Sequence, residues 1–186
     1  MNRQQPQIRF VRVTAANWRE VIALRVSNHQ QNFVPPVFSS LATAFMGGSE
    51  IYSHPYGIYA GLELVGFFVC AFKPEDPTTC YWSGFLIDHR CQGRGLGRLA
   101  LNQLLENLPA HYRGCSAVIA DVHPDNTAAI NLYHQAGFRE TGDRSHGDYP
   151  IIRCDLKGQS NTREIRTKGD SHEQSREQTN REPMAT

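Results

Sequence analysis

The sequence lacks the cysteine and histidine patterns that hold structural metals. Its 186 residues include five cysteines, but these form no Cys-x-x-Cys pair, and no Cys/His cluster has the spacing of a metal site. An odd number of cysteines also argues against a framework of paired disulfides. We therefore expect a protein of a reducing compartment, most simply the cytoplasm, without a structural metal. The five thiols are Cys70, Cys80, Cys91, Cys115 and Cys154.

Long apolar runs and an excess of charge of one sign are also absent. The N-terminus, MNRQQPQIRF, has no apolar signal core, and the longest apolar run, Leu64 to Phe72, contains Gly66 and is too short to cross a bilayer. Lys and Arg number 19 against 18 Asp and Glu, and no long block of like charge occurs. These patterns predict a cytoplasmic protein with neither a membrane nor a nucleic acid as its partner.

The distribution of apolar residues predicts one folded domain followed by an unfolded tail. Residues 1–156 contain enough apolar positions for a single core. Residues 157–186 contain no aromatic side chain and are rich in Gln, Ser, Thr, Arg and Glu, so burial cannot offset the entropy lost on ordering them. We therefore expect residues 1–156 to form the domain and residues 157–186 to be a disordered polar tail.

Strand-like and helix-like patterns alternate along the domain, which predicts a mixed α/β fold in the order β-α-α-β-β-β-α-β-α-β-β. Thr14 stands where the first helix would have its N-cap, and Pro109 stands where the third helix would stop. The expected elements are strand 8–13, a helix from residue 18 that fades near residue 30, helix 35–48, strands 56–60, 64–72 and 80–88, helix 96–108, strand 116–122, helix 126–136 and a closing hairpin 138–155 around residues 146–147.

A glycine-rich turn between a strand and a helix is the strongest chemical signal. The segment Gln92-Gly93-Arg94-Gly95-Leu96-Gly97-Arg98 has glycines that let the backbone turn tightly and approach a ligand closely. Free amides at the start of the helix, the helix dipole and the arginines at 90, 94 and 98 favour an anion such as a pyrophosphate. The alternative is a connection whose glycines serve the turn alone. Neither Gly-x-Gly-x-x-Gly nor Gly-Lys-Ser/Thr is present.

Two segments resemble the GNAT superfamily of N-acetyltransferases. Residues Gln92 to Gly97 match the Gln/Arg-x-x-Gly-x-Gly/Ala signature with which these enzymes hold the pyrophosphate of coenzyme A. Downstream, Asn126-Thr127-Ala128-Ala129-Ile130-Asn131-Leu132-Tyr133, followed by Ala136-Gly137-Phe138, is similar to the superfamily's Asn-x-x-Ala-x-x-Leu-Tyr…Gly-Phe segment. The resemblance covers Ile8 to Leu156 and implies the mixed-sheet fold of the superfamily.

Within the superfamily, residues 26–34 and 55–61 look most like bacterial spermine/spermidine acetyltransferases. Ser83 and Gly84 depart from that likeness, because polyamine acetyltransferases of this type carry charged residues there. The implied acceptor is the primary amine of a small molecule, with a polyamine as one candidate. The alternatives are a protein N-terminus or lysine as acceptor, and a non-catalytic acyl-coenzyme A binding module. Many relatives dimerise, so a homodimer is expected by analogy.

The resemblance also implies how the cosubstrate, acetyl-coenzyme A, is held and used. It would lie between the strand before the glycine turn and the next strand, and the amine would attack its thioester directly in a ternary complex. No cysteine has an activating base beside it in sequence, so an acyl-enzyme is the minor alternative. Tyr133 would protonate the departing thiolate, although its place on an apolar helix face also suits packing. The implied coenzyme contacts are Phe85, Leu86, Ile87, Gln92, Gly93, Arg94, Gly95, Leu96, Gly97, Arg98, Asn126 and Tyr133, with no metal.

The group that removes a proton from the amine is left open by the sequence. An alkylamine with a pKa of about 10.4 is only about one part in 10³ neutral at pH 7, so some group must take its proton. The candidates are Glu50, Glu63, Asp121 and His123, and none is singled out by spacing. His123 equally fits an exposed loop residue, and Asn126 equally fits a helix N-cap.

Overall fold

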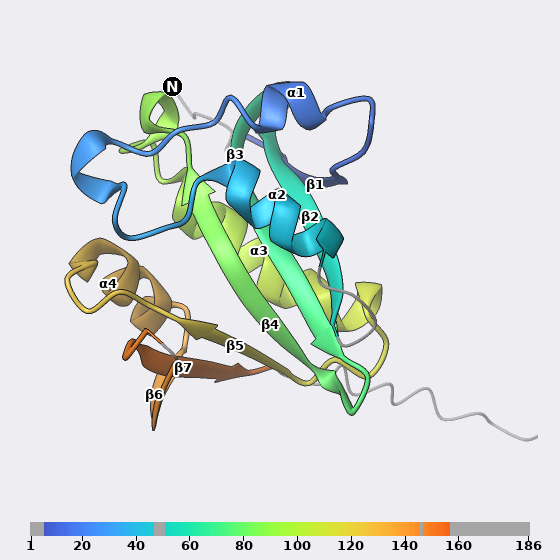
Figure 1. The fold of residues 1–186 in the computed structure, drawn as a ribbon, viewed down its shortest axis with the longest axis vertical. Helices are drawn as coiled ribbons and strands as arrows, with labels where there is room; N and C mark the ends of the chain where they lie inside the picture. The colour runs from blue at the N-terminus through green and yellow to red at the C-terminus, as the bar shows by residue number, and fades with distance from the viewer. Residues whose placement is uncertain (1–5, 47–50, 146, 157–186) are drawn as a thin grey trace, which may run out of the picture.

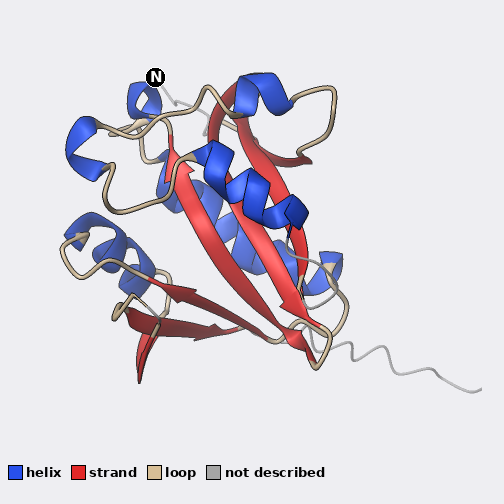
Figure 2. Ribbon diagram, viewed as in Figure 1, coloured by secondary structure: helices blue, strands red, loops and turns tan. Residues whose placement is uncertain are grey.

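A seven-stranded mixed sheet runs through the protein, with helices on both of its faces (Figures 1 and 2). The computed structural model describes residues 6–46, 51–145 and 147–156. The expected tail, Glu50 and His146 lie outside the described residues. The elements are β1 (Ile8–Arg12), α1 (Trp18–Val21), η1 (Asn28–Gln30), α2 (Val37–Met46), β2 (Tyr52–Ala60), β3 (Glu63–Lys73), β4 (Asp76–Ile87), η3 (His89–Cys91), α3 (Leu96–His111), β5 (Ala117–Asp121), α4 (Thr127–Gln135), β6 (Arg139–Arg144) and β7 (Pro150–Asp155).

The strands lie in the order β1-β2-β3-β4-β5-β7-β6. Every neighbouring pair is antiparallel except β4 and β5, which are parallel and are joined across the sheet by α3. A parallel pair needs such a crossover because the chain must return to the edge from which it started. Apart from the short 3₁₀ turns η1 and η3, the order of elements is the predicted one.

The helices cover the two faces of the sheet unequally. Behind the sheet in Figure 1, α3 packs its apolar side, Leu96, Ala100, Leu101, Leu104 and Leu108, on the larger core. On the front face, α1 and α2 bury Val21, Val37 and Leu41 against β3 and β4 in a second, smaller core. Because β3 lies between these two cores, its residues are buried on both sides, which explains its nearly continuous apolar run.

Strands β4 and β5 separate at their carboxyl ends. Their pairing runs from Thr79 with Ala117 to Trp82 with Ala120, after which β5 ends while β4 continues to Ile87 beside β3. An irregularity in the β3–β4 register falls at Gly84, whose φ of 65° is a conformation that glycine adopts without strain. The last residues of β4 therefore have a free edge on the side of β5.

The first helix is much shorter than predicted. It ends at Val21, and the chain then leaves the helical path because the Arg25 amide donates to the Asp88 carboxylate (3.0 Å) instead of to a helical carbonyl. The β-branched residues in this segment also favour helix weakly. Thr14 is not the N-cap, which is Asn17; the Thr14 carbonyl instead accepts from the Trp18 amide.

The third helix is longer than predicted, because it passes Pro109 and ends at His111. A proline costs a helix one hydrogen bond and crowds the preceding turn, but in the last turn the helix has few residues left to disrupt. The Tyr112 amide still donates to the Leu108 carbonyl (2.8 Å) beyond the proline. Leu108 is 1% exposed, so tertiary packing holds this last turn in place.

Candidate active site

The glycine-rich turn presents backbone amides to a cavity. Gly93 and Gly95 have φ of 73° and 75°, and Gly95 is the N-cap of α3 without any side-chain cap. The first amides of a helix have no partner inside it, so those of Leu96, Gly97 and Arg98 remain available. A Cβ placed on Gly93 or Gly95 would meet no atom within 4 Å, which shows that the turn faces open space. Such a turn suits an anion.

We call the hollow beside this turn the turn cavity. Its volume is about 370 Å³, and its apolar wall comes from the end of β4 and from α4. Ten of the predicted coenzyme contacts line it: Phe85, Leu86, Ile87, Gln92, Gly93, Gly95, Leu96, Gly97, Arg98 and Asn126. Val26, Gln30, Phe33, Val34, Cys91, Ala128, Ala129 and Leu132 complete the lining.

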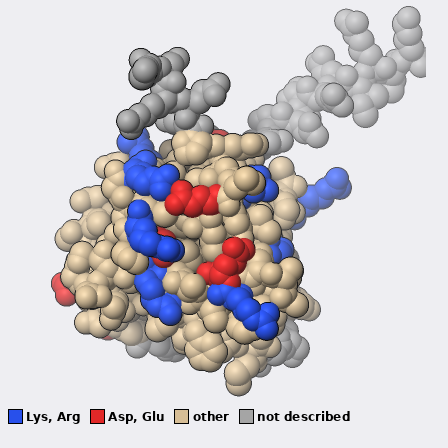
Figure 3. All heavy atoms as spheres, turned by 90° about the horizontal axis from the view of Figure 1, so that it is seen from above, with Lys and Arg blue, Asp and Glu red and all other residues tan. Residues whose placement is uncertain are grey.

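The arginines of this region divide into one that lines the turn cavity and two that are engaged elsewhere. Arg98 lines the cavity. Arg94 is not among the lining residues, and its guanidinium lies 3.2 Å from the Glu63 carboxylate. Arg90 lies 2.7 Å from the Asp88 carboxylate. Basic and acidic side chains accordingly lie side by side on the surface seen from above in Figure 3.

Gln92 and Asp88 hold the turn in position. The Gln92 amide group donates to the Ile87 carbonyl and to the Gln30 side chain, each at 2.9 Å, which ties the turn to β4 and η1. The buried Asp88 carboxylate accepts from the amides of Arg25 and Arg90 and from the Arg90 guanidinium. Burial acts to raise the pKa of Asp88, but these hydrogen bonds and the Arg90 charge lower its pKa overall.

A second hollow, the tyrosine cavity, opens where β4 and β5 separate. Its volume is about 260 Å³, and it shares Phe33, Val34, Phe85 and Asn126 with the turn cavity. Its other lining residues are Pro35, Trp82, Ser83, Gly84, Asp121, Val122, His123, Tyr133 and Tyr149. The two cavities are therefore neighbours, bordered by the same four residues.

Tyr133 combines the two roles that the sequence left open. The side chain packs on Phe138 with ring centroids 5.1 Å apart, and the residue is 6% exposed. Its hydroxyl has no hydrogen-bond partner among the described residues, although the residue lines the tyrosine cavity. Burial, followed by the nearby Asp121 carboxylate, raises the pKa of Tyr133 well above its ordinary value. The phenol therefore stays protonated at neutral pH and can donate a proton into the cavity.

The structure places three of the four candidate bases, and it brings only two of them to the tyrosine cavity. Asp121, at the end of β5, and His123 line the tyrosine cavity. Glu63 lies elsewhere, at the start of β3, where it pairs with Arg94 and accepts from the Cys91 thiol (3.4 Å). Glu50 lies outside the described residues. The His123 ring accepts at Nδ1 from the Asp125 amide (3.2 Å), so the neutral ring carries its proton on Nε2.

Asn126 is the N-cap of α4, because its Oδ1 accepts from the Ala129 amide (3.2 Å). It also lines both cavities, so the predicted cap and a ligand contact are compatible. Three aromatic residues that line the tyrosine cavity were not predicted: Phe33, Trp82 and Tyr149. Isolated aromatic residues in irregular segments, as at 33 and 149, were the available signal, but their position depends on tertiary structure.

Two kinds of structure are not found among the described residues. No group of three or more His, Cys, Asp and Glu side chains in that part of the chain is arranged to hold a metal ion. No helix in the described ranges is long and apolar enough to span a membrane.

A mixed sheet that opens beside a glycine-rich helix start, with a protonated tyrosine in the opening, defines the class of transferases that use acyl-coenzyme A. A family model described as the acetyltransferase (GNAT) family matches residues 19–138. The chain belongs to this family and is an N-acetyltransferase. The family assignment makes acetyl-coenzyme A its cosubstrate.

Individual relatives agree with the family assignment. The spermine/spermidine N(1)-acetyltransferase of Bacillus subtilis is 31% identical over 137 residues, which is 70% of this chain and 87% of the relative. The N-alpha-acetyltransferase RimI of Mycobacterium tuberculosis is 34% identical over 94 residues, 50% of this chain and 56% of the relative. A solved spermidine N-acetyltransferase from Vibrio cholerae, in complex with coenzyme A and spermine, has the same fold with a TM-score of 0.64 at 14% identity, covering 81% of this chain and 96% of that one.

Proposed function

We propose that the protein transfers the acetyl group of acetyl-coenzyme A to a primary amine of a small molecule, directly and within a ternary complex. The observation that carries this proposal is that the turn cavity and the tyrosine cavity adjoin, with four lining residues in common, where β4 and β5 separate. Tyr133 lines the second cavity with a hydroxyl that has no partner among the described residues. Carrier, acceptor and acid can thus meet in one place.

The residues of the turn cavity fit acetyl-coenzyme A in chemical character. The amides between Gln92 and Arg98, together with the Arg98 guanidinium, would hold the pyrophosphate. The free edge of β4 from Phe85 to Ile87 would offer backbone groups to the pantetheine arm, as an added strand would. Phe85 and Leu132 supply apolar surface to the same arm.

The proposed reaction needs one proton removed and one supplied. The lone pair of the neutral amine forms a bond to the acetyl carbon while the carbon–sulfur bond breaks, leaving an amide and the coenzyme A thiolate. Tyr133 donates its proton to that sulfur and regains one from solvent. Because a thiol has a pKa of only about 8.5, the thiolate already leaves readily, and the acid should contribute at the low end of about 10²–10⁴-fold.

Asp121 is our candidate for the group that receives the ammonium and takes its proton, directly or through water. Deprotonating an alkylamine at pH 7 costs about 4–5 kcal/mol, and a carboxylate beside the ammonium can both hold it and accept the proton. His123 is a poorer candidate because its Nδ1 accepts from the Asp125 amide, which leaves a proton on Nε2 of the neutral ring. Glu63 is remote from the tyrosine cavity and paired with Arg94.

The relatives suggest two acceptor classes. The relatives that match over 87% of their own length are named for spermine or spermidine, which supports a small amine as the acceptor. The RimI relative acts by name on an α-amino group, and its match supports a protein N-terminus as the second candidate over a shorter stretch. The acceptor opening is a cavity of about 260 Å³ rather than a long groove, which favours the small amine.

A coenzyme A release assay tests the proposal. Purified full-length protein is given acetyl-coenzyme A with each member of a panel of small primary amines and of peptides with free N-termini or lysines. We expect thiol release and an N-acetylated product with small amines. Turnover of peptides but of no small amine would show that the acceptor is a protein N-terminus or lysine instead. Binding of acetyl-coenzyme A without turnover of any amine would reduce the protein to a binding module.

A further inference from the structure

The tyrosine cavity has one carboxylate and many aromatic rings, an arrangement that bears on which amine it accepts. Asp121 is the only carboxylate among the described residues that line it, and the lining of the turn cavity includes no described carboxylate at all. The aromatic lining consists of Phe33, Trp82, Phe85, His123, Tyr133 and Tyr149. This inference rests on the proposed function, because it concerns the acceptor of the same site.

The rings form two packed groups rather than a scattered set. In one group the His123 ring packs on both Phe33 and Tyr149, with centroids 5.0 Å from each. In the other group Trp82 and Phe85 pack edge to face with centroids 5.2 Å apart. Rings packed on one another keep fixed positions, so they present a preformed apolar surface to the body of a ligand. Aromatic faces also attract an ammonium group.

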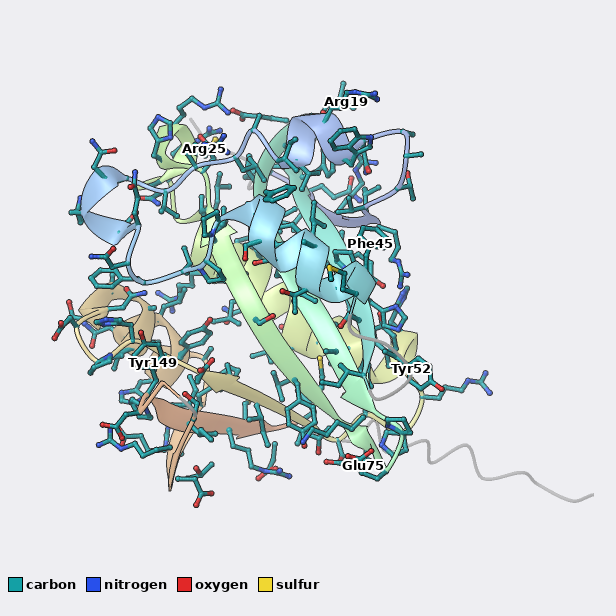
Figure 4. The ribbon with its side chains drawn as sticks, in the orientation of Figure 1. Arg19, Arg25, Phe45, Tyr52, Glu75 and Tyr149 are labelled. Carbon is teal, nitrogen blue, oxygen red and sulfur yellow. The ribbon has the colours of Figure 1, made fainter. Side chains whose placement is uncertain are left out.

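A second ammonium would meet no second carboxylate among the described residues that line the tyrosine cavity and its neighbouring hollows. Beyond the segment of residues 34–35 lies another hollow, the proline cavity, of about 580 Å³, which has Val34 and Pro35 in common with the tyrosine cavity. Its lining includes one charged side chain, Arg25. The Arg25 guanidinium donates to the Leu24 carbonyl (2.8 Å), which holds the positive charge in place. In Figure 4, Arg25 is labelled at the upper left of the molecule and Tyr149 at the lower left.

We infer that the preferred acceptor is a monoamine with an aromatic or apolar body, such as an arylalkylamine, rather than a polyamine. Asp121 holds the single ammonium, and the rings of Phe33 and Tyr149 pack on the body. A polyamine carries further ammonium groups, and each one that leaves water without a carboxylate partner is penalised. The fixed charge of Arg25 adds repulsion against them, which is how a site rejects a competitor as well as selecting its ligand.

Matched amines test this inference through kcat/KM. Hexylamine and 1,6-diaminohexane differ by one ammonium on the same chain, and phenethylamine and spermidine extend the comparison. We expect each monoamine to exceed its polycationic counterpart by at least about tenfold in kcat/KM, the equivalent of about 1.4 kcal/mol. Equal or better use of 1,6-diaminohexane and spermidine would overturn the inference while leaving the proposed acetyl transfer intact.

Two variants locate the selectivity in the named residues. Arg25→Gln should narrow the preference for phenethylamine over spermidine severalfold, and Tyr149→Ala should lower kcat/KM for phenethylamine about tenfold with the KM for acetyl-coenzyme A unchanged. Asp155→Asn is the control, because Asp155 is 77% exposed and pairs with Arg153 outside the cavities. Unaltered selectivity in both variants, with melting temperatures close to that of the parent, would contradict the assignment.

Equilibrium binding separates this inference from the proposed function. Phenethylamine and spermidine are titrated into protein saturated with coenzyme A, and into the Asp121→Asn variant prepared in the same way. If phenethylamine binds more tightly than spermidine, and this preference is lost in Asp121→Asn, the inference is supported. It is supported even if no amine is turned over; in that case only the proposed acetyl transfer is rejected. Tighter binding of spermidine, or binding that is insensitive to Asp121→Asn, rejects the inference.

Discussion

At the turn cavity, the coenzyme end of the site, the groups that would hold an anion are backbone amides of a single short segment, Gln92 to Arg98. At the tyrosine cavity, the acceptor end, the groups that face a ligand are side chains from several separate segments, among them Phe33, Asp121 and Tyr149. Amides at a helix start need no particular side chain to bind an anion, whereas a wall of side chains changes with each substitution. The first end therefore suits a cosubstrate common to a family, and the second suits an acceptor that differs between its members.

A negative charge placed in the glycine turn should weaken acetyl-coenzyme A binding more than any other change proposed here. Gly95→Glu puts a carboxylate beside the anion site, and repulsion at about 4 Å with an effective dielectric constant near 20 amounts to about 4 kcal/mol. We expect the Kd for acetyl-coenzyme A, measured by calorimetry, to rise about 1,000-fold. Gly114→Glu is the matched control, because Gly114 also has a positive φ, of 88°, in open space but lies between α3 and β5. A weak effect at 95, or an equal loss at 114, would show that the turn holds no anion.

Removal of the Tyr133 hydroxyl should slow the reaction without weakening acetyl-coenzyme A binding. We expect Tyr133→Phe to lower kcat about 100-fold and to leave the Kd for acetyl-coenzyme A unchanged, because the phenol acts on the departing sulfur. Tyr112→Phe is the control, because its hydroxyl bonds that of Tyr56 (2.7 Å) and neither residue lines the turn cavity or the tyrosine cavity. Unchanged turnover in Tyr133→Phe would leave this tyrosine a packing residue.

The same tyrosine predicts the form of the pH profile. Burial and the Asp121 charge raise the pKa of Tyr133, so the acid stays protonated through the range in which the amine loses its proton. kcat/KM should rise with pH toward the pKa of the amine and show no falling limb below about pH 10. A decline between pH 8 and 9 in stopped assays with intact protein would assign the acid to another group.

The contrast between the two ends also explains what the sequence could predict. The glycine turn and the β4 edge occupy adjacent positions in the chain, so their meeting follows from local strand and helix patterns. Asp121 and Tyr133 meet because β5 and α4 follow one another. Phe33 and Tyr149, in contrast, reach the same cavity from segments with no regular pattern. Their positions depend on the packing of His123 between them, which no local pattern records.

The prediction of the first helix was wrong in length for the same reason, a contact between segments far apart in the sequence. Its apolar spacing continues past Val21, yet the Arg25 amide binds Asp88, 63 residues away in the sequence. A buried carboxylate that needs donors can override a weak helical preference, since leaving it unpaired costs more than a few helical hydrogen bonds. The start of α2 was predicted well because its signal is local, with two prolines before it; residues 47–48, where the predicted helix ends, lie outside the described residues.

Asp88 connects the two ends, and its loss should weaken the fold more than the chemistry. It accepts hydrogen bonds from Arg25, in the segment that leads to Phe33, and from Arg90, beside the glycine turn. We expect Asp88→Ala to lower the free energy of unfolding by about 2–3 kcal/mol, because it leaves buried donors unpaired. Asp155→Ala, on an exposed pair, should cost less than about 1 kcal/mol.

Acid provides an independent check on Asp88. Its pKa is lowered in the folded protein, so the carboxylate stabilises the fold above its unfolded pKa of about 3.9, and that contribution is lost as pH falls through the lower folded value. Urea unfolding should therefore show the gap between parent and Asp88→Ala narrowing below about pH 4. A gap that is constant from pH 7 to pH 3 would mean that packing, not charge, sets the effect.

The smallest expected effect is at Asn126, which belongs to both cavities. Asn126→Ala removes the cap on α4 and should cost about 1 kcal/mol of stability, whereas Asn126→Ser keeps a side-chain oxygen and should cost only a few tenths. Both variants lose the amide nitrogen, so if that group donates to the coenzyme, both should weaken acetyl-coenzyme A binding by the same factor, about fivefold. Binding that follows stability instead, weakened in the alanine variant and normal in the serine variant, would make Asn126 a cap alone. The polar contacts of the coenzyme would then come from the glycine turn and Arg98, and α4 would contribute apolar surface only.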